Sequence, residues 1–364
     1  MQREDYITQF QTECYLPAAT AAMNRFMVSY TDHAEEIHKT VVGQFDAFFR
    51  CIVRLQDRKL MDDIHSVAIS FPYSSLLCGN PCMIFEVYPD FPFFAPKLVQ
   101  EIFSAPWIFP DWNEFYEDLL HRTQKLSLGT VVRPPFIKST MWDTARYILH
   151  LVSTFVKTQM VDVELLPSFH SMRKADAFRV TFGEYMDWQR LIYAQLPPID
   201  IFNCEEFEPL SFRKFRSAVY EDKVFENLEL DDARFISCIF KNCLFKNSKF
   251  RDAKFEGCDF EGCRFEQVRL DGARFSGSKL YDVEMSGIKT NCMVPDPDTI
   301  LGGFTTTDFV NCFLENVSIT DSDYSASQFQ GCQAKNLTSD TSELSSSLEQ
   351  LLTQKQGGVE DGLL

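Results

Sequence analysis

The sequence predicts an α+β, helix-rich N-terminal domain over residues 1–200, followed by an all-β repeat domain over residues 201–340. Two observations carry this prediction. Apolar residues recur at helical spacing through much of the first half, and a period of five residues governs the second half. The remaining residues, 341–364, predict a short helix and a disordered tail. The 14% content of aromatic residues excludes a wholly disordered chain.

The N-terminal domain begins with two predicted helices, in LPAATAAMNRFMVSY and EEIHKTVVGQFDAFFRCIVRLQ, where apolar residues lie three or four positions apart. A β-hairpin is expected over residues 65–88, from the runs SVAISFPYSSLL and MIFEVYP. Further helices are expected near residues 112–125, 139–158 and 183–195. No motif in this domain identifies a family, so α+β is its best description.

Several polar and aromatic groups of this domain invite a catalytic interpretation. His33 and His38 accompany two glutamates, but His38 lies about 140° around a helix from His33, which indicates a solvated face. On the helix predicted in FGEYMDWQRLIY, Glu184 and Asp187 share a face, where surface charge is the commoner role. An aromatic group either lines a pocket or forms core: Trp107, Phe109, Trp112 and Phe115. No nucleotide-binding or hydrolase motif is present, so we predict no catalytic, cofactor-binding or metal-binding residue and no cofactor.

Twelve cysteines are expected to be mostly thiols, because the N-terminal MQREDYITQFQ lacks the apolar region of a secretory signal. No run of about 18 apolar residues occurs, so no membrane-spanning helix is expected. These features predict a cytoplasmic location. Cys78 and Cys82 in CGNPC are spaced like half of a zinc site, but no second pair follows, which favours a turn between two strands.

A period of five residues dominates the second half of the chain. Every fifth position from 210 to 285 is large and apolar, a regularity that neither a helix nor a strand produces. These central positions are Leu210, Phe215, Tyr220, Phe225, Leu230, Phe235, Phe240, Phe245, Phe250, Phe255, Phe260, Phe265, Leu270, Phe275, Leu280 and Met285. Each central residue therefore predicts one inward-facing side chain of a repeating core.

Two further positions of the repeat are restricted. Small side chains stand two residues before the centre, as in Ala233, Cys238, Cys243, Ser248, Cys258 and Cys263. Residues that tolerate tight bends stand two residues after it, as in Asp232, Asn242, Asn247, Gly257 and Gly262. One large residue, one small residue and one corner thus recur every five residues, so the cysteines in this phase are predicted to be small core residues.

This pattern resembles the pentapeptide-repeat family, in segments such as DARFISCIFKNCLFKNSKFRDAKFEGCDFEGCRF, over residues ~205–335. The resemblance implies a right-handed quadrilateral β-helix, a solenoid with four repeats in each coil. Some members of the family protect DNA gyrase and are understood as acidic rods that imitate duplex DNA. That activity would need a continuous acidic stripe along the rod.

The repeat breaks at NCMVPDPDTILGG, residues 291–303, which we expect to form a loop leaving the solenoid. The period then resumes at Phe304, Phe309, Leu314, Ile319, Tyr324 and Phe329. We expect this insertion to interrupt the register. A helix starting near Ser342 is expected either to cap the last coil or to join two copies in a homodimer.

With four repeats in each coil, residues twenty apart stack on one face, and two rows of basic residues result. The first basic row consists of Arg234, Lys254 and Arg274, and the second, on the adjacent face, consists of Lys249, Arg269 and Lys289. Stacked like charges repel, so the rows are candidate binding residues for an acidic partner. The alternative is a solvated surface in which Asp231, Glu256 and Asp271 offset the rows.

The formal net charge of -17 is unevenly distributed and argues against direct nucleic-acid binding. Residues 201–290 carry 17 acids and 15 bases, whereas residues 291–364 carry 11 acids and 2 bases. The main rod is therefore nearly neutral. The sequence favours a non-enzymatic binding or scaffold protein with a protein or peptide partner. Two alternatives stay open: an enzyme or accessory subunit, for example of a peptide-modifying enzyme, with a pocket in the N-terminal domain or at the domain junction, and a DNA-mimicking modulator of a type II topoisomerase.

Overall fold

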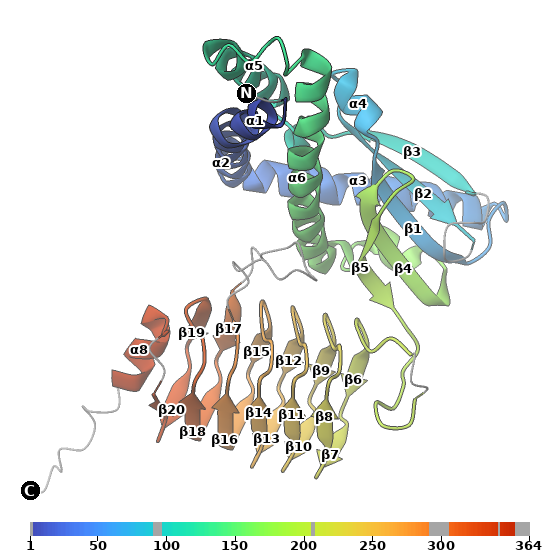
Figure 1. The fold of residues 1–364 in the computed structure, drawn as a ribbon. Coiled ribbons are helices and arrows are strands. Elements are labelled where there is room, and N and C mark those ends of the chain that lie inside the picture. Colours follow the sequence, from blue (N-terminus) through green and yellow to red (C-terminus); the bar gives the residue numbers. More distant parts are fainter. Residues whose placement is uncertain (1–2, 90–96, 205–207, 291–305, 341–342, 354–364) are drawn as a thin grey trace, which may run out of the picture. The chain divides into compact units, whose positions relative to one another are not determined.

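The computed structural model describes residues 3–89, 97–204, 208–290, 306–340 and 343–353, and the chain divides into two compact units, Met1–Tyr193 and Ala194–Leu364 (Figure 1). The expected loop at 291–303 and the tail beyond 356 lie outside the described residues. No helix within the described ranges is both long and apolar enough to cross a bilayer.

The first unit contains seven α-helices and five strands within its described residues. The helical segments are α1 (Arg3–Gln9), the π-helical η1 (Phe10–Tyr15), α2 (Leu16–Asp32), α3 (Ala34–Asp57), α4 (Tyr73–Leu77), the short η2 (Pro106–Ile108), α5 (Trp112–Lys125), α6 (Pro134–Val163) and α7 (Pro167–Ser171). The strands are β1 (Ile64–Phe71), β2 (Cys82–Tyr88), β3 (Val99–Ser104), β4 (Lys174–Glu184) and β5 (Gln189–Gln195). The expected α+β character is therefore present.

The five strands form one sheet in the order β3-β2-β1-β4-β5, in which β1 and β2 are antiparallel and β1 and β4 are parallel. One face of the sheet packs against α3: Phe45 and Phe48 contact the Phe85 ring edge-on, with centroids 5.3 and 5.4 Å apart. A second apolar cluster joins η1, α2, α5 and the start of α6 around Phe10 and Phe115. The core of the unit therefore combines the apolar faces of helices, as the helical spacing predicts, with the apolar side chains of the sheet.

The predicted helix over 183–195 is wrong, because these residues form the end of β4, a turn and β5. The Glu184 amide donates a hydrogen bond to the Trp188 carbonyl at 3.0 Å, which closes the turn. Gly183 is required there, since an added Cβ would lie 2.0 Å from that carbonyl oxygen. Pairing with the neighbouring strands therefore overrides the apolar spacing that suggested a helix.

The second unit is a β-solenoid whose short strands stack in parallel (Figure 1). Its strands are β6 (Lys214–Arg216), β7 (Val219–Glu221), β8 (Val224–Glu226), β9 (Arg234–Ile236), β10 (Ile239–Lys241), β11 (Leu244–Lys246), β12 (Lys254–Glu256), β13 (Asp259–Glu261), β14 (Arg264–Glu266), β15 (Arg274–Ser276), β16 (Lys279–Ser286), β17 (Thr307–Val310), β18 (Phe313–Thr320), β19 (Ser327–Gln330), β20 (Gln333–Lys335) and β21 (Thr338–Ser339). Pairing at a 20-residue register, as between Phe235 and Phe255, confirms that four repeats make one coil.

Four ladders of central residues run through the solenoid. Ladder 1 is Phe215, Phe235, Phe255, Phe275, Phe309 and Phe329. Ladder 2 contains Tyr220, Phe240, Phe260, Leu280, Leu314 and Ala334, and ladder 3 contains Phe225, Phe245, Phe265, Met285, Ile319 and Ser339. Ladder 4 contains Leu230, Phe250, Leu270, Thr290 and Tyr324. On this face, isolated β-bridges join neighbouring coils, and each member of the ladder directly follows a bridged residue. Phe255 and Phe275 stack with centroids 4.5 Å apart, close to the ~4.8 Å spacing of strands.

Local chemistry explains the other two positions of the repeat. The predicted corner residues adopt positive φ, for example +50° at Asn242 and +62° at Gly262, where Gly, Asn and Asp are least strained. The small residues bond between coils: the Cys258 thiol donates to the Phe235 carbonyl oxygen at 3.3 Å, and the Ser278 hydroxyl donates to that of Phe255 at 3.1 Å. The described cysteines are free, and those at Cys238, Cys243, Cys258, Cys263 and Cys312 are buried core residues as predicted.

The insertion after position 290 does not interrupt the register, contrary to expectation. Thr290 occupies the next central place of ladder 4, fully buried, with its hydroxyl donating to the Asp323 carbonyl at 2.8 Å. Phe309 then pairs directly with Phe275. The step from 275 to 309 is 34 residues instead of 20, so 14 residues are added at one corner while the ladders continue.

The final helix, α8 (Ser346–Thr353), begins four residues later than expected and packs against β19 and β20 of its own chain. Leu348 and Leu351 are buried in the solenoid core. The helix therefore covers the last coil of its own chain.

Candidate functional site

The residues of the first basic row directly precede the Phe residues of ladder 1 on the same strands. They are stacked as predicted, because Lys254 pairs with Arg234 on one side and with Arg274 on the other. The row is longer than the sequence analysis recognised. Lys214 extends it at the start of the solenoid, and Asp308 ends it on β17. The residue Asp308 was missed because the insertion hides its register with Arg274.

Neighbouring acids offset much of the first basic row. The Arg234 guanidinium lies 3.1 Å from a Glu256 carboxylate oxygen, and the Arg274 guanidinium lies 3.8 Å from a carboxylate oxygen of Asp308. These pairs are partly exposed to solvent, so each adds little to stability. They nevertheless lower the positive potential that an acidic partner would meet along this row.

The residues of the second basic row directly precede those of ladder 4. Isolated β-bridges connect Lys249 to Arg269 and Arg269 to Lys289. The same line begins with Glu229 and continues beyond the insertion to Asp323 and Glu343. We call this line of six residues the charge ladder. Its charge changes from positive to negative between Lys289 and Asp323, which the sequence analysis missed because 34 residues separate them.

Two of the three bases in the charge ladder have acidic neighbours. The Lys249 ammonium lies 2.9 Å from a Glu229 carboxylate oxygen, and its hydrogen bond lowers the pKa of Glu229. The Arg269 guanidinium lies 2.8 Å from Asp271, a carboxylate whose pKa is raised by burial and lowered to a smaller extent by Arg269. Among the ion pairs between described residues, none involves Lys289. Lys289 is therefore the base of the ladder best placed to meet a partner.

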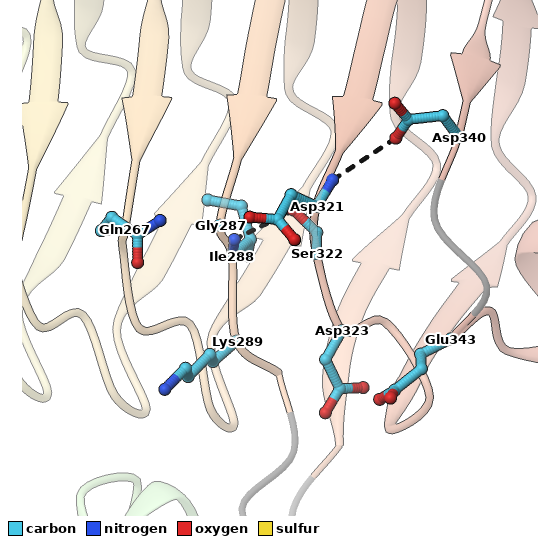
Figure 2. Close-up of a pocket in the computed structure, with 9 residues that line it drawn as sticks. All are labelled: Gln267, Gly287, Ile288, Lys289, Asp321, Ser322, Asp323, Asp340 and Glu343. Atoms are coloured by element: carbon cyan, nitrogen blue, oxygen red, sulfur yellow. Dashed lines mark hydrogen bonds between the residues drawn. The ribbon is translucent and has the colours of Figure 1, made fainter.

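An open groove of about 420 Å³ lies where the charge ladder changes sign (Figure 2). Lys289 lines it together with four acids, Asp321, Asp323, Asp340 and Glu343. The stacked carboxylates of Asp323 and Glu343 lie close together in Figure 2, on neighbouring coils. Four carboxylates against one ammonium leave the groove acidic.

The groove is shaped by backbone and hydroxyl contacts. Asp321 donates its amide to a carboxylate oxygen of Asp340 at 3.4 Å, and Asp323 accepts the Ser325 amide at 2.9 Å. The Ile288 amide donates to the Ser322 hydroxyl at 2.9 Å, which ties the two coils behind the groove. No group of three or more His, Cys, Asp or Glu side chains among the described residues is arranged to hold a metal ion.

The aromatic group of the first unit forms core. Phe109 and Phe115 are buried, and the Trp112 ring lies between them with centroid distances of 5.3 and 5.8 Å. A cavity of only about 20 Å³ remains beside them. A space of this size holds about one water molecule, which needs about 10–15 Å³, so it offers no room for a substrate.

The histidines at 33 and 38 do not form a joint site. His33 donates its Nδ1–H to the Ser29 carbonyl oxygen at 2.9 Å near the end of α2, whereas His38 contacts Gln159 on α6 and lies 3.6 Å from Asp162. Cys78 is exposed at the end of α4, within the connection between β1 and β2, and Cys82 is the first residue of β2.

Glu184 ends β4 and Asp187 lies in the hairpin turn that follows, and Glu184 belongs to a polar cluster. Its carboxylate lies 3.8 Å from Arg146 on α6, with one buried oxygen lacking a hydrogen-bond partner. Burial, with a smaller contribution from Asp187, raises the pKa of Glu184. One turn further along α6, His150 stacks on Trp188 at 4.0 Å, and burial followed by Arg190 and Arg146 lowers its pKa. The sequence could not reveal this cluster, because it depends on α6 facing the hairpin.

We predict that Glu184 makes the first unit less stable as the pH rises. A carboxyl whose pKa is raised by folding binds its proton more tightly in the folded state, so its contribution is complete below the ordinary carboxyl range and is lost as the pH passes the raised pKa. The melting temperature of Glu184→Gln should fall less than that of the parent between about pH 4 and about pH 8. The exposed Glu114→Gln is the control, and equal slopes for the parent and Glu184→Gln would contradict the assignment.

A family model described as pentapeptide repeats, with nine copies, matches residues 235–284. These residues are pentapeptide repeats, as the resemblance of the sequence predicts. No curated protein sequence gives a match.

Three solved structures illustrate the similarity. A trypsin-treated form of QnrB1, a plasmid-mediated fluoroquinolone resistance protein, is 15% identical, with 41% of this chain and 92% of that chain covered and a TM-score of 0.17. The pentapeptide repeat protein Rfr23 from the cyanobacterium Cyanothece 51142 is 11% identical, with 36% and 92% covered and a TM-score of 0.14. A pentapeptide repeat protein from the Arabidopsis thaliana thylakoid lumen is 15% identical, with 39% and 73% covered and a TM-score of 0.15. With TM-scores this low, these likenesses support no statement about function.

Proposed function

We propose that the protein is a non-enzymatic binding protein whose solenoid engages a protein partner along the charge ladder, with the N-terminal unit supplying a second contact surface. The observation that carries this proposal is the change of sign along the ladder beside an open groove. The solenoid is taken to be the right-handed quadrilateral β-helix that its repeats imply. The two basic rows would supply the positively charged part of the binding surface. The first row is Arg234, Lys254 and Arg274, and the second is Lys249, Arg269 and Lys289.

The spacing of the ladder suits an α-helix lying along the solenoid axis. Successive coils present one charged side chain about every 4.8 Å. A helix rises about 1.5 Å per residue, so its side chains at i, i+3 and i+7 repeat every 4.5–6 Å. The partner helix would carry acidic residues opposite Lys249, Arg269 and Lys289, and basic residues opposite Asp323 and Glu343. Such complementarity selects partners and their orientation more than it adds affinity.

A topoisomerase modulator that imitates DNA is less well supported. That activity requires a continuous run of acids, whereas the acids after the change of sign, Asp323 and Glu343, follow three bases. The proposal also places the protein in the cytoplasm. It is supported by the free thiols of the described cysteines, which an oxidising compartment would tend to pair.

The proposal predicts that charge reversal on either side of the sign change weakens the partner. Crosslinking and affinity purification from the native host would first identify the partner, and its affinity would then be measured by titration calorimetry. Lys289→Glu and Glu343→Lys should each weaken binding by about tenfold or more, because each places a like charge against the partner.

The control is Lys335→Glu, which reverses an exposed lysine that pairs with Glu315 away from the charge ladder. Its affinity should change by less than about twofold. Unchanged affinity in Lys289→Glu and Glu343→Lys, or the absence of any specific partner, would contradict the proposed surface.

A further inference from the structure

A second cleft, of about 360 Å³, opens at the first coil of the solenoid and is separate from the charge ladder. One wall is the segment that leads into the solenoid, including Asp200 and Phe202, and the other is formed by β6 and β7. Its size is within the range of about 300–1,000 Å³ that is usual for ligand sites. The cleft lies within the second unit and does not depend on the function proposed above.

Positive charge dominates the polar lining of this cleft. Lys214, Arg216 and Lys223 line it, and Asp200 is the acid among those lining residues that the structure describes. Both Asp200 carboxylate oxygens are already engaged, one by the Phe202 amide at 3.0 Å and the other by the Asn203 side chain at 2.6 Å. Three bases against one acid that is already hydrogen-bonded leave a surface suited to an anionic group.

The base of the cleft is apolar. Phe215 and Tyr220, the first members of ladders 1 and 2, lie beneath it, and Val219 points into it with 62% of its surface exposed. Phe202 covers part of the open end of the core, with its ring 5.0 Å from Phe225 and 6.0 Å from Tyr220. The Lys223 ammonium lies 5.2 Å from the Phe202 ring centroid, so a charged rim stands next to the apolar base.

The cleft is also bordered by the free end of the solenoid sheets. Strand β6 is the last member of the six-stranded sheet, and β7 and β8 end the ten-stranded sheet. In the described part of the chain, no strand pairs with the outer edges of β6 and β7. An edge strand can accept an extended peptide through backbone hydrogen bonds, which a small organic acid cannot exploit.

We propose that this cleft binds the C-terminal end of an extended peptide chain whose last side chain is large and apolar. The terminal carboxylate lies among Lys214, Arg216 and Lys223, the last side chain covers Val219 and the ring of Phe215, and the peptide backbone runs beside β6. Each of the three features of the cleft thereby meets its complement: the positive rim, the apolar base and the sheet edge.

The test uses the full-length protein and a dansylated tetrapeptide, Ala-Ala-Ala-Leu, with a free C-terminal carboxylate. Fluorescence anisotropy should show saturable binding that weakens as salt is added, because the attraction between carboxylate and ammonium groups is screened. The same peptide with a C-terminal amide should bind at least about tenfold more weakly, since the amide removes the charge. Arg216→Glu combined with Lys223→Glu should weaken the free acid by a similar factor, and Val219→Asp should also weaken it.

The matched control is Arg264→Glu combined with Lys279→Glu, which reverses two exposed bases on later coils and should leave the affinity within about twofold. Circular dichroism would verify that each variant keeps its β structure. Equal affinity for the acid and the amide, or no measurable binding of either, would overturn the proposal. Binding of sodium decanoate as tight as that of the peptide acid would overturn the assignment to a peptide chain.

Discussion

Replacement of Phe260 by alanine should lower the free energy of unfolding of the solenoid unit by about 3–5 kcal/mol. Phe260 is fully buried on ladder 2, and its ring stacks on Phe240 with centroids 4.7 Å apart and planes within 7°. The rings of Phe255 and Phe265 contact it from the neighbouring ladders at 5.7 and 5.8 Å. Truncation would leave a cavity walled by aromatic rings that belong to regular coils and cannot collapse into it.

Chemical denaturation followed by circular dichroism would measure this loss. Phe313→Ala is the matched control, because Phe313 is half-buried on the outside of β18 and contacts Tyr281 at 5.7 Å. Its cost should be below about 1 kcal/mol. Similar losses for Phe260→Ala and Phe313→Ala would show that stacking within the solenoid is not the main source of its stability.

Replacement of Arg213 by alanine should cost the same unit about 2–4 kcal/mol, although the repeat pattern alone predicts no loss. Arg213 stands where later coils have Ala233, Ala253 and Ala273, so alanine should fit. The structure places its side chain at 5% exposure. Its guanidinium donates to the Pro209 carbonyl at 2.9 Å, to the Pro197 carbonyl and to the Glu208 carboxylate at 2.7 Å.

The loss should be concentrated at the start of the solenoid, because Arg213 ties Pro197, Glu208 and Pro209 to the first coil. Hydrogen exchange should therefore become faster in residues 197–204 of Arg213→Ala before it does so in later coils. Arg216→Ala, a change of the same type at an exposed position on β6, is the stability control. Equal stability of the parent and Arg213→Ala would mean that these bonds contribute nothing beyond what water supplies.

The repeat unit was predictable from the sequence because its interactions are periodic and local. Phe245, Cys243 and Asn247 each have the size or backbone preference that one position of a five-residue period requires. With the four repeats per coil that the resemblance implies, Arg234, Lys254 and Arg274 were correctly stacked. The expected offset by acids is also present, because Glu256 pairs with Arg234 and Asp271 pairs with Arg269. The pairing of Asp308 with Arg274 could not be predicted, since the insertion hides their common register.

Prediction failed where a partner distant in the chain decides the outcome. The apolar spacing around Gly183 suggested a helix, but pairing of β4 with β1 makes it a strand. Thr290 was overlooked as a central residue because it is polar, and its burial depends on a hydrogen bond to Asp323 across the insertion. The cluster of Arg146, His150 and Glu184 exists only because α6 faces the hairpin.

By itself, the sequence determined a five-residue repeat of one large residue, one small residue and one corner around an aromatic interior, because steric and backbone preferences act within five residues. Its resemblance to pentapeptide repeats implied four repeats in each coil, and hence the stacked charged rows. Only the tertiary structure decided that the ladders continue across 14 added residues, that the charge ladder changes sign at Lys289, and that Arg213 anchors the first coil. These features depend on which side chains meet across coils, and neither residue type nor local spacing specifies that contact.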